Sequence, residues 1–368
     1  MSPAAGIHVP LLPESRAPAT PASVPGAVVN VATSIIGAGI MSIPAIMKVL
    51  GVFPAIAMIL VVAVLAEVSV DFLMRFTHTG ETTTYAGVMR EAFGPPGALA
   101  AQICVIITNV GGLILYLIII ADVLSGKHDG DEVHLGILQQ WFGIQWWNSR
   151  EIALLFTLVF VMLPLVLYKR VVHPIGFELG KPSDMTTAVR LALLLCAVIY
   201  LTIGLFGYLL FGDSTQSDIL INFDQSDDSV VGSLFNSLVR VSYALHIMLV
   251  FPLVNFSLRA NIDEVLFPKK PLLATDNKRF VILSLVLLVF SYLAAITIPD
   301  IWYFFQFLGS TSAVCLAFIF PGCIVLRDAH GISTRRDKII ALIMIILAVV
   351  TSVIAISTNI FNAFSSKS

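Results

Sequence analysis

The sequence is poor in charged residues. Only 12% of its 368 residues are Asp, Glu, Lys or Arg, whereas a soluble domain has roughly 25%, and the net charge is −2 at pH 7. A chain with so little charge cannot build the basic surface that holds a nucleic acid, so we expect no nucleic acid partner. By contrast, 58% of the residues are hydrophobic and the mean hydropathy is +0.94. This composition predicts an integral membrane protein surrounded by lipids.

Cysteine and histidine are also sparse, and their spacing is uninformative. The four cysteines lie inside apolar stretches and form no C-x-x-C pair, which argues against a disulfide framework or a zinc site. The seven histidines include neither H-x-x-x-H nor H-E-x-x-H. No G-x-S-x-G or paired catalytic aspartate motif is present. We therefore expect no metal, no cofactor and no enzyme activity.

Nine mostly apolar stretches are long enough to cross a membrane as helices, which takes about 20 residues. They are 27–50, 52–75, 98–124, 151–168, 189–211, 231–256, 280–298, 302–326 and 339–357. We expect an all-α membrane protein with one transmembrane domain over residues 27–357.

The segments outside these spans are polar. Residues 1–26 are rich in proline and small residues, so we expect a disordered cytosolic tail, and residues 358–368 form a second, non-cytosolic tail. The stretch 125–150 reads as a non-cytosolic loop whose three tryptophans suit the membrane interface. The stretch 169–188 reads as a cytosolic linker.

Lys and Arg are divided unequally between the two sets of connections. One set holds 16 of the 21 basic residues and the other holds 4, while Arg240 falls within a span. Because basic flanks are retained on the cytosolic side, we expect the N-terminus to be cytosolic.

The first span is interrupted near its middle by Gly37, Ala38 and Gly39, with Pro44 one turn later. An unpaired backbone N–H or C=O in hydrocarbon costs several kcal/mol, so a break persists only where it lines a cavity. Close packing of small residues between helices is the alternative. We favour a break whose N–H groups meet a substrate carboxylate at the positive end of the following half-helix.

Ionisable residues inside the spans are few. Asp71 and Arg75 lie one turn apart and should pair, whereas Glu67 lies deeper and is either a proton carrier or a polar partner of another helix. Histidine is the side chain that most readily changes its charge near neutral pH, so His246 is either a proton-coupling group or a neutral packing residue. Gly309 to Ser312 form either a gate or flexible joint, or a simple helix contact.

The sequence resembles a known family of membrane proteins. From Asn30 to Leu50 it reads NVATSIIGAGIMSIPAIMKVL, which is similar to the opening helix of the amino acid/auxin permease family and its pattern G-[SA]-G-I-[LM]-x-[IL]-P. The stretches 173–190, 236–252 and 305–322 resemble plant vacuolar-type members, relatives of the sodium-coupled neutral amino acid transporters. The resemblance implies the leucine-transporter fold, in which two inverted five-helix repeats hold a substrate between the broken first and sixth helices.

The family pattern implies eleven spans, two more than we count. In relatives, two helices follow the basic end of the fourth span at Lys169 and Arg170, but here only Val171 and Val172 precede His173. Two spans with their loop take roughly 50 to 70 residues, so the fifth and sixth helices are missing. The sixth helix supplies half of the family's substrate site, and the loss puts transport itself in doubt.

The resemblance implies secondary transport of neutral amino acids, as symport or antiport, across the plasma membrane or a vacuolar membrane. A non-transporting amino acid sensor or regulatory membrane protein is the alternative. Met248 and Val250 stand where sodium-coupled relatives place oxygen ligands, which leaves proton coupling and uniport open. The substrate-binding residues that we expect are Thr33, Ile36, Gly37, Ala38, Gly39, Ile40, Asn109 and Tyr116, and the proton-coupling candidates are Glu67 and His246.

Overall fold

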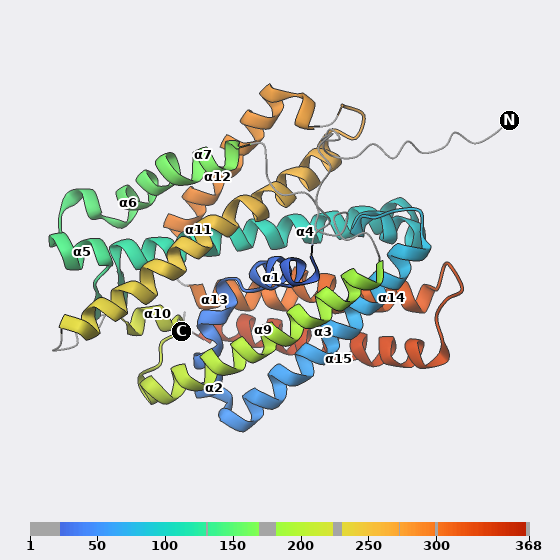
Figure 1. Cartoon of the computed structure of the whole chain (residues 1–368), viewed down its shortest axis with the longest axis horizontal. Coiled ribbons are helices and arrows are strands. Elements are labelled where there is room, and N and C mark those ends of the chain that lie inside the picture. The colour runs from blue at the N-terminus through green and yellow to red at the C-terminus, as the bar shows by residue number, and fades with distance from the viewer. Residues whose placement is uncertain are drawn as a thin grey trace.

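A computed structural model of the chain describes residues 23–129, 132–168, 182–223, 230–271, 273–298 and 301–365. Helices make up nearly all of this part (Figure 1). Two short strands, β1 (Lys127–Asp129) and β2 (Glu132–His134), pair antiparallel in the loop after the third span. The predicted all-α membrane architecture is confirmed.

The described residues contain nine candidate membrane-spanning units, which match the nine predicted stretches one for one. Eight are continuous, and the first is a pair of helical segments bent by 60°. In chain order the units are α1 (Val24–Ile35) with η1 (Ala38–Ser42) and α2 (Ile43–Leu50); α3 (Val52–Thr79); α4 (Tyr85–Ser125); α6 (Arg150–Thr157) with η3 (Leu158–Met162) and α7 (Leu163–Leu167); α9 (Pro182–Phe211); α11 (Val230–Leu266); α12 (Asn277–Thr297); α13 (Ile301–Leu308) with η6 (Gly309–Ala313), η7 (Cys315–Ile319) and α14 (Phe320–Arg327); and α15 (Arg335–Ser365). The connections contain α5 (Ile137–Phe142), η2 (Trp146–Asn148), η4 (Gly212–Ser214), α10 (Ile219–Asn222) and η5 (Leu273–Thr275).

Helical structure extends past the predicted limits of the transmembrane domain. The first helix begins at Val24, where the hydroxyl of Ser23 accepts a hydrogen bond from the N–H of Gly26. The last helix continues to Ser365. Residues 1–22 of the predicted tail and 169–181 of the predicted linker lie outside the described residues.

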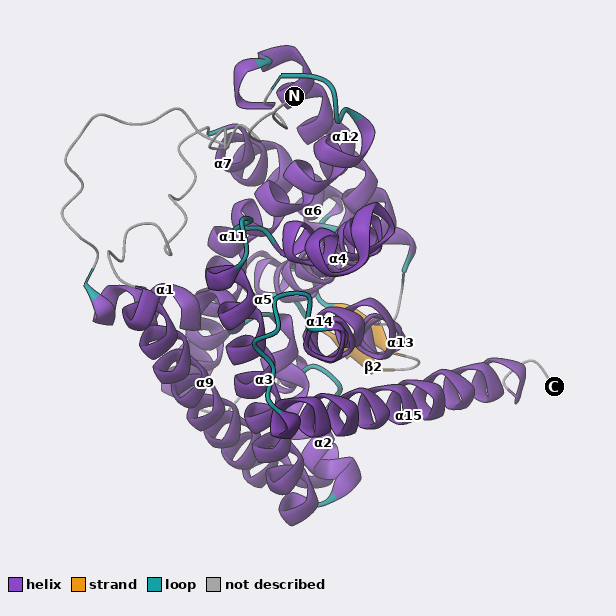
Figure 2. Cartoon of the chain, turned by 90° about the vertical axis from the view of Figure 1, so that its right-hand side faces the viewer, coloured by secondary structure: helices purple, strands orange, loops and turns teal. Residues whose placement is uncertain are grey.

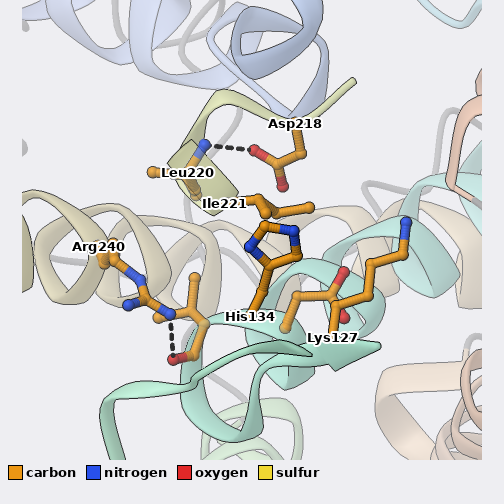
Figure 3. A pocket seen from close by; sticks show the side chains of 8 residues that line it. Lys127, His134, Asp218, Leu220, Ile221 and Arg240 are labelled. Carbon is orange, nitrogen blue, oxygen red and sulfur yellow. Dashed lines mark hydrogen bonds between the residues drawn. The ribbon is translucent and has the colours of Figure 1, made fainter. Parts of the chain in front are cut away.

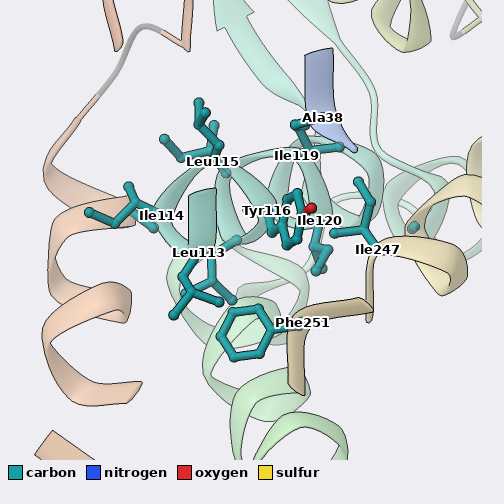
Figure 4. Close-up of a cluster of buried hydrophobic side chains, with 14 of the residues drawn as sticks. Ala38, Leu113, Ile114, Leu115, Tyr116, Ile119, Ile120, Ile247 and Phe251 are labelled. Atoms are coloured by element: carbon teal, nitrogen blue, oxygen red, sulfur yellow. The ribbon is translucent and has the colours of Figure 1, made fainter. Parts of the chain in front are cut away.

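The centre of the molecule is α4. Its stretch 113–121 is buried throughout, because these mostly branched aliphatic residues are apolar on every side of the helix (Figure 4). Around it lie α6, α11 and α12. Helices α9 and α15 lie along the lower edge of the molecule in Figure 2. Together with α3 they expose leucine, valine and phenylalanine side chains, as helices that face lipid do.

A sharp bend divides α4 near its start. Gly94 has a φ of +71°, a conformation that glycine adopts at no steric cost, and Pro95 and Pro96 follow it. The segment before Gly94 therefore packs as a short separate helix, which the predicted span of 98–124 did not include.

Candidate functional site

The break in the first span lies at Ile36 and Gly37. Ile36 has extended backbone angles, Gly37 follows with φ −117° and ψ −160°, and the chain then continues as the 3-10 helix η1. Further on, Pro44 lies in the first turn of α2, where a missing N–H costs no hydrogen bond. The helix is thus interrupted where the sequence predicted it.

Neighbouring helices supply partners for the carbonyl groups that the break releases. Two tyrosines and one histidine from α9 and α11 donate to three successive oxygens: Tyr200 Oη to Ile35 O at 3.0 Å, His246 Nε2 to Ile36 O at 3.0 Å, and Tyr243 Oη to Gly37 O at 2.9 Å. Because a carbonyl oxygen only accepts, Nε2 of His246 carries the proton, and Nδ1 is the nitrogen that can take a second one.

The N–H groups at the break are in a different situation. Across the described part of the chain, the backbone N–H groups of Gly37, Ala38 and Gly39 donate to no acceptor, and the first internal bond of η1 runs from the N–H of Ile40 to Gly37 O at 3.3 Å. They stand at the positive end of the second half-helix. Gly37 and Gly39 are partly exposed, so the break offers three neighbouring donors to a ligand.

Tyr116 lies directly against the break. A Cβ atom built on Gly37 would come within 3.0 Å of the Tyr116 hydroxyl, whereas one built on Gly39 would meet nothing within 4 Å. The ring of Tyr116 is buried in the same core as Ala38 and Ile247 (Figure 4). The open space beside the three donors therefore lies on the Gly39 side.

The side chains of the remaining substrate-binding candidates make other contacts. The hydroxyl of Thr33 bonds the carbonyl groups of Val29 and Asn30 in its own helix. Ile40 is buried in the core. Asn109 lies two turns from Tyr116 on α4 and donates to Ser257 Oγ at 3.0 Å. These contacts suit packing and helix pairing.

The two proton-coupling candidates have different surroundings. His246 contacts the break itself, whereas Glu67 pairs with Arg190 of α9 at 3.0 Å. The expected pair of Asp71 and Arg75 is confirmed at 3.1 Å. Arg190 also reaches Asp71, so Glu67 belongs to a group of ion pairs that joins α3 to α9.

Sequence reasoning missed two residues that complete the site. The sequence analysis assigned no role in the site to Tyr200 or Tyr243. Both contacts depend on how α9 and α11 are rotated against α1, which a single sequence does not encode. The available signal was a tyrosine near the middle of an apolar span, where its hydroxyl needs a partner.

Known proteins match nearly the whole chain. The profile of a family described as "Transmembrane amino acid transporter protein" matches residues 20–166 and 132–361. Amino acid transporter AVT6C of Arabidopsis thaliana is 50% identical over 408 aligned positions, which cover 92% of this chain and 94% of that protein. Amino acid transporter AVT6D of the same plant is 48% identical over 434 positions, covering 98% of each. Sodium-coupled neutral amino acid transporter 4 of Pongo abelii is 29% identical over 195 positions, covering 51% of this chain and 35% of that protein.

These alignments are longer than the chain itself. The first has 408 positions and the second 434, although the chain has 368 residues. Because only about 339 residues of this chain fill the first alignment (92% of 368) and about 361 fill the second (98% of 368), roughly 70 positions of each relative have no counterpart here, about the length of two membrane spans with their loop. This difference agrees with the two missing spans predicted from the sequence.

Proposed function

We propose, because the chain belongs to the transmembrane amino acid transporter family, that it binds a neutral amino acid at the break between α1 and η1 and carries it across a membrane. The proposal rests on the three N–H groups at Gly37, Ala38 and Gly39, which have no acceptor among the described residues. Donors at membrane depth need a partner. The carboxylate of an amino acid supplies two oxygens, and the positive end of the half-helix favours its charge.

The other parts of the proposed site follow from this placement. Tyr116 borders the carboxylate, and Ile36 lies at the turn that presents the three donors. The oxygen of Gly37 already accepts from Tyr243, but a carbonyl oxygen has a second lone pair that can accept from the ammonium group of the substrate. Thr33, Ile40 and Asn109 would then hold the surrounding helices in place.

The open space beside Gly39 allows a direct test. Gly39→Ala adds one methyl group that meets no protein atom within 4 Å, so folding should be unaffected. If the substrate occupies this space, the methyl group should weaken binding of a labelled neutral amino acid by at least tenfold. Gly309→Ala is the matched control, because its methyl group also meets nothing within 4 Å but lies on η6. Equal affinity of both variants and the unchanged protein would contradict the proposed site.

Coupling and orientation belong to the same proposal. We favour protons over sodium, with His246 as the coupling group, because Nδ1 of its ring can take a proton while Nε2 keeps its bond to the break. The distribution of Lys and Arg supports a cytosolic N-terminus. Either the plasma membrane or a vacuolar membrane is compatible with these features.

A second function is favoured by the missing positions. If these positions are the fifth and sixth helices of the family pattern, half of the family's substrate site is absent, and the chain would bind an amino acid without moving it, as a sensor or regulatory membrane protein does. Purified protein in liposomes separates the two functions. Substrate binding together with uptake indicates a transporter, and binding without uptake indicates a sensor.

A further inference from the structure

A short helix covers the broken span on the side that the basic residues mark as non-cytosolic. This helix, α10, lies in the connection between α9 and α11 and packs against η1 and α4. Ile219 and Leu220 are buried in the same core as Ala38 and Ile40. The preceding turn is tied to α2, because Lys48 Nζ donates to the carbonyl oxygen of Thr215 at 3.2 Å.

The carboxyl group of Asp218 begins this helix and is almost completely buried. Asp218 is 2% exposed, and its Oδ1 accepts from the N–H of Leu220 at 2.9 Å. Its Oδ2 is buried and has no hydrogen-bond partner within the described residues. This oxygen faces a small cavity of about 10 Å³, enough for about one water molecule, lined also by Asp122, Lys127, His134 and Arg240 (Figure 3).

The charges around this cavity leave Asp218 poorly compensated. Arg150 of α6 forms its ion pair with Asp122 of α4. Arg240 of α11 donates to the carbonyl oxygen of Leu135 at 2.9 Å and to that of Val123 at 3.4 Å. In Figure 3 the amino group of Lys127 from β1 ends to the right of Asp218, and the ring of His134 from β2 lies below Asp218.

Protonation of Asp218 removes the cost of burying its negative charge. A buried carboxylate without a partner is unfavourable, whereas the neutral acid tolerates burial. Burial accordingly raises the pKa of Asp218 to about 7, and the negative charge of Asp122 adds to the shift, although the N–H of Leu220 and the positive charges of Lys127 and Arg240 oppose it. An exposed aspartate has a pKa of about 4, so the packed form of α10 binds a proton that a detached α10 would release.

We propose that Asp218 is a proton-binding site and that its proton holds α10 closed over the non-cytosolic face of the broken helix. The role of this closure in transport rests on the proposed function, but the closure itself does not. The sign follows from the raised pKa: the added stability of the closed form is complete below pH 4 and is lost as pH rises through 7. An acidic compartment on this side would therefore favour a covered site.

Hydrogen exchange of the full-length protein in detergent tests the proposal without any substrate. After correction for the intrinsic exchange rate at each pH, protection of residues 218–222 should fall by up to about tenfold per pH unit between pH 5 and 7, because one proton is released. It should then level off above pH 7. The variant Asp218→Asn keeps the oxygen that caps Leu220 but cannot titrate, so its protection should not change with pH.

The control is Asp213→Asn, which alters an exposed aspartate of the same connection and should behave like the unchanged protein. Parallel pH profiles in the unchanged protein and Asp218→Asn would overturn the proposal. If Asp218→Asn does not fold, the unchanged protein still decides, because constant protection from pH 5 to 9 contradicts a proton at this site. Loss of substrate binding in Gly39→Ala leaves this result unaffected, so the two proposals fail separately.

Discussion

Gly37 and Gly39 belong to one short motif but have different surroundings. Gly37 faces the hydroxyl of Tyr116, whereas Gly39 faces open space. The sequence predicted an interruption here, since glycines and a proline inside an apolar span are poorly compatible with a straight helix. It did not distinguish the two glycines, because that difference depends on a tyrosine more than seventy residues away.

The contact with Tyr116 predicts a rescue between two substitutions. Gly37 has a negative φ that alanine can adopt, so Gly37→Ala acts only through its methyl group, 3.0 Å from the tyrosine hydroxyl. Overpacking of this kind typically costs about 1–3 kcal/mol. Tyr116→Phe removes that oxygen, and the next ring atoms are 3.9 Å away. Thermal unfolding in detergent should show a smaller loss for Gly37→Ala in the Tyr116→Phe background; an equal loss in both backgrounds would exclude this contact as the cause.

The sequence predicts where the spanning helices lie better than it predicts their exact starts and internal irregularities. Nine apolar stretches became nine spanning units, because the thickness of a bilayer fixes the length of such helices. The start of α4 was missed, since the predicted span begins at residue 98 whereas the helix begins at Tyr85 and bends at Gly94. The π-helical segments η6 and η7 were missed as well, because a single inserted residue leaves no clear pattern in an apolar run.

Ion pairs between α3, α9 and α15 distinguish the two proton-coupling candidates, Glu67 and His246. Glu67 pairs with Arg190, and Arg75 joins Asp71 to Asp337. We expect Glu67→Gln to leave the pH dependence of substrate binding unchanged, because the glutamate acts as a fixed partner of arginine. His246→Gln can keep a donor for Ile36 but cannot titrate, so it should weaken that dependence. Binding measured from pH 5 to 8 compares the two variants, and the opposite pattern would assign the coupling role to Glu67.

At the scale of the whole molecule, the chain differs from its relatives mainly by the loss of an internal segment. The chain aligns with nearly the full length of AVT6D, yet roughly 70 positions are missing. The family pattern predicts the loss at Val172, which lies outside the described residues. Removal of an even number of spans keeps every later helix in its original direction, so the remaining nine can still assemble.

Restoring the missing segment should restore transport if its loss is limiting. We expect insertion of the corresponding segment of AVT6C after Val172 to raise uptake of a labelled neutral amino acid into proteoliposomes by at least tenfold. A Gly/Ser insert of equal length controls for the longer connection. Equal uptake by the original chain and the restored chain would show that the two spans are dispensable.

The three hydrogen bonds at the break have a mechanical consequence. Tyr200 holds Ile35 from α9, while His246 and Tyr243 hold Ile36 and Gly37 from α11. If α1 tilts relative to these helices, it must exchange the bonds for others, and each is worth about 1 kcal/mol. Helix α1 would then move between a few discrete orientations. The hydrogen bonds from the tyrosine and histidine side chains would determine which orientations are stable.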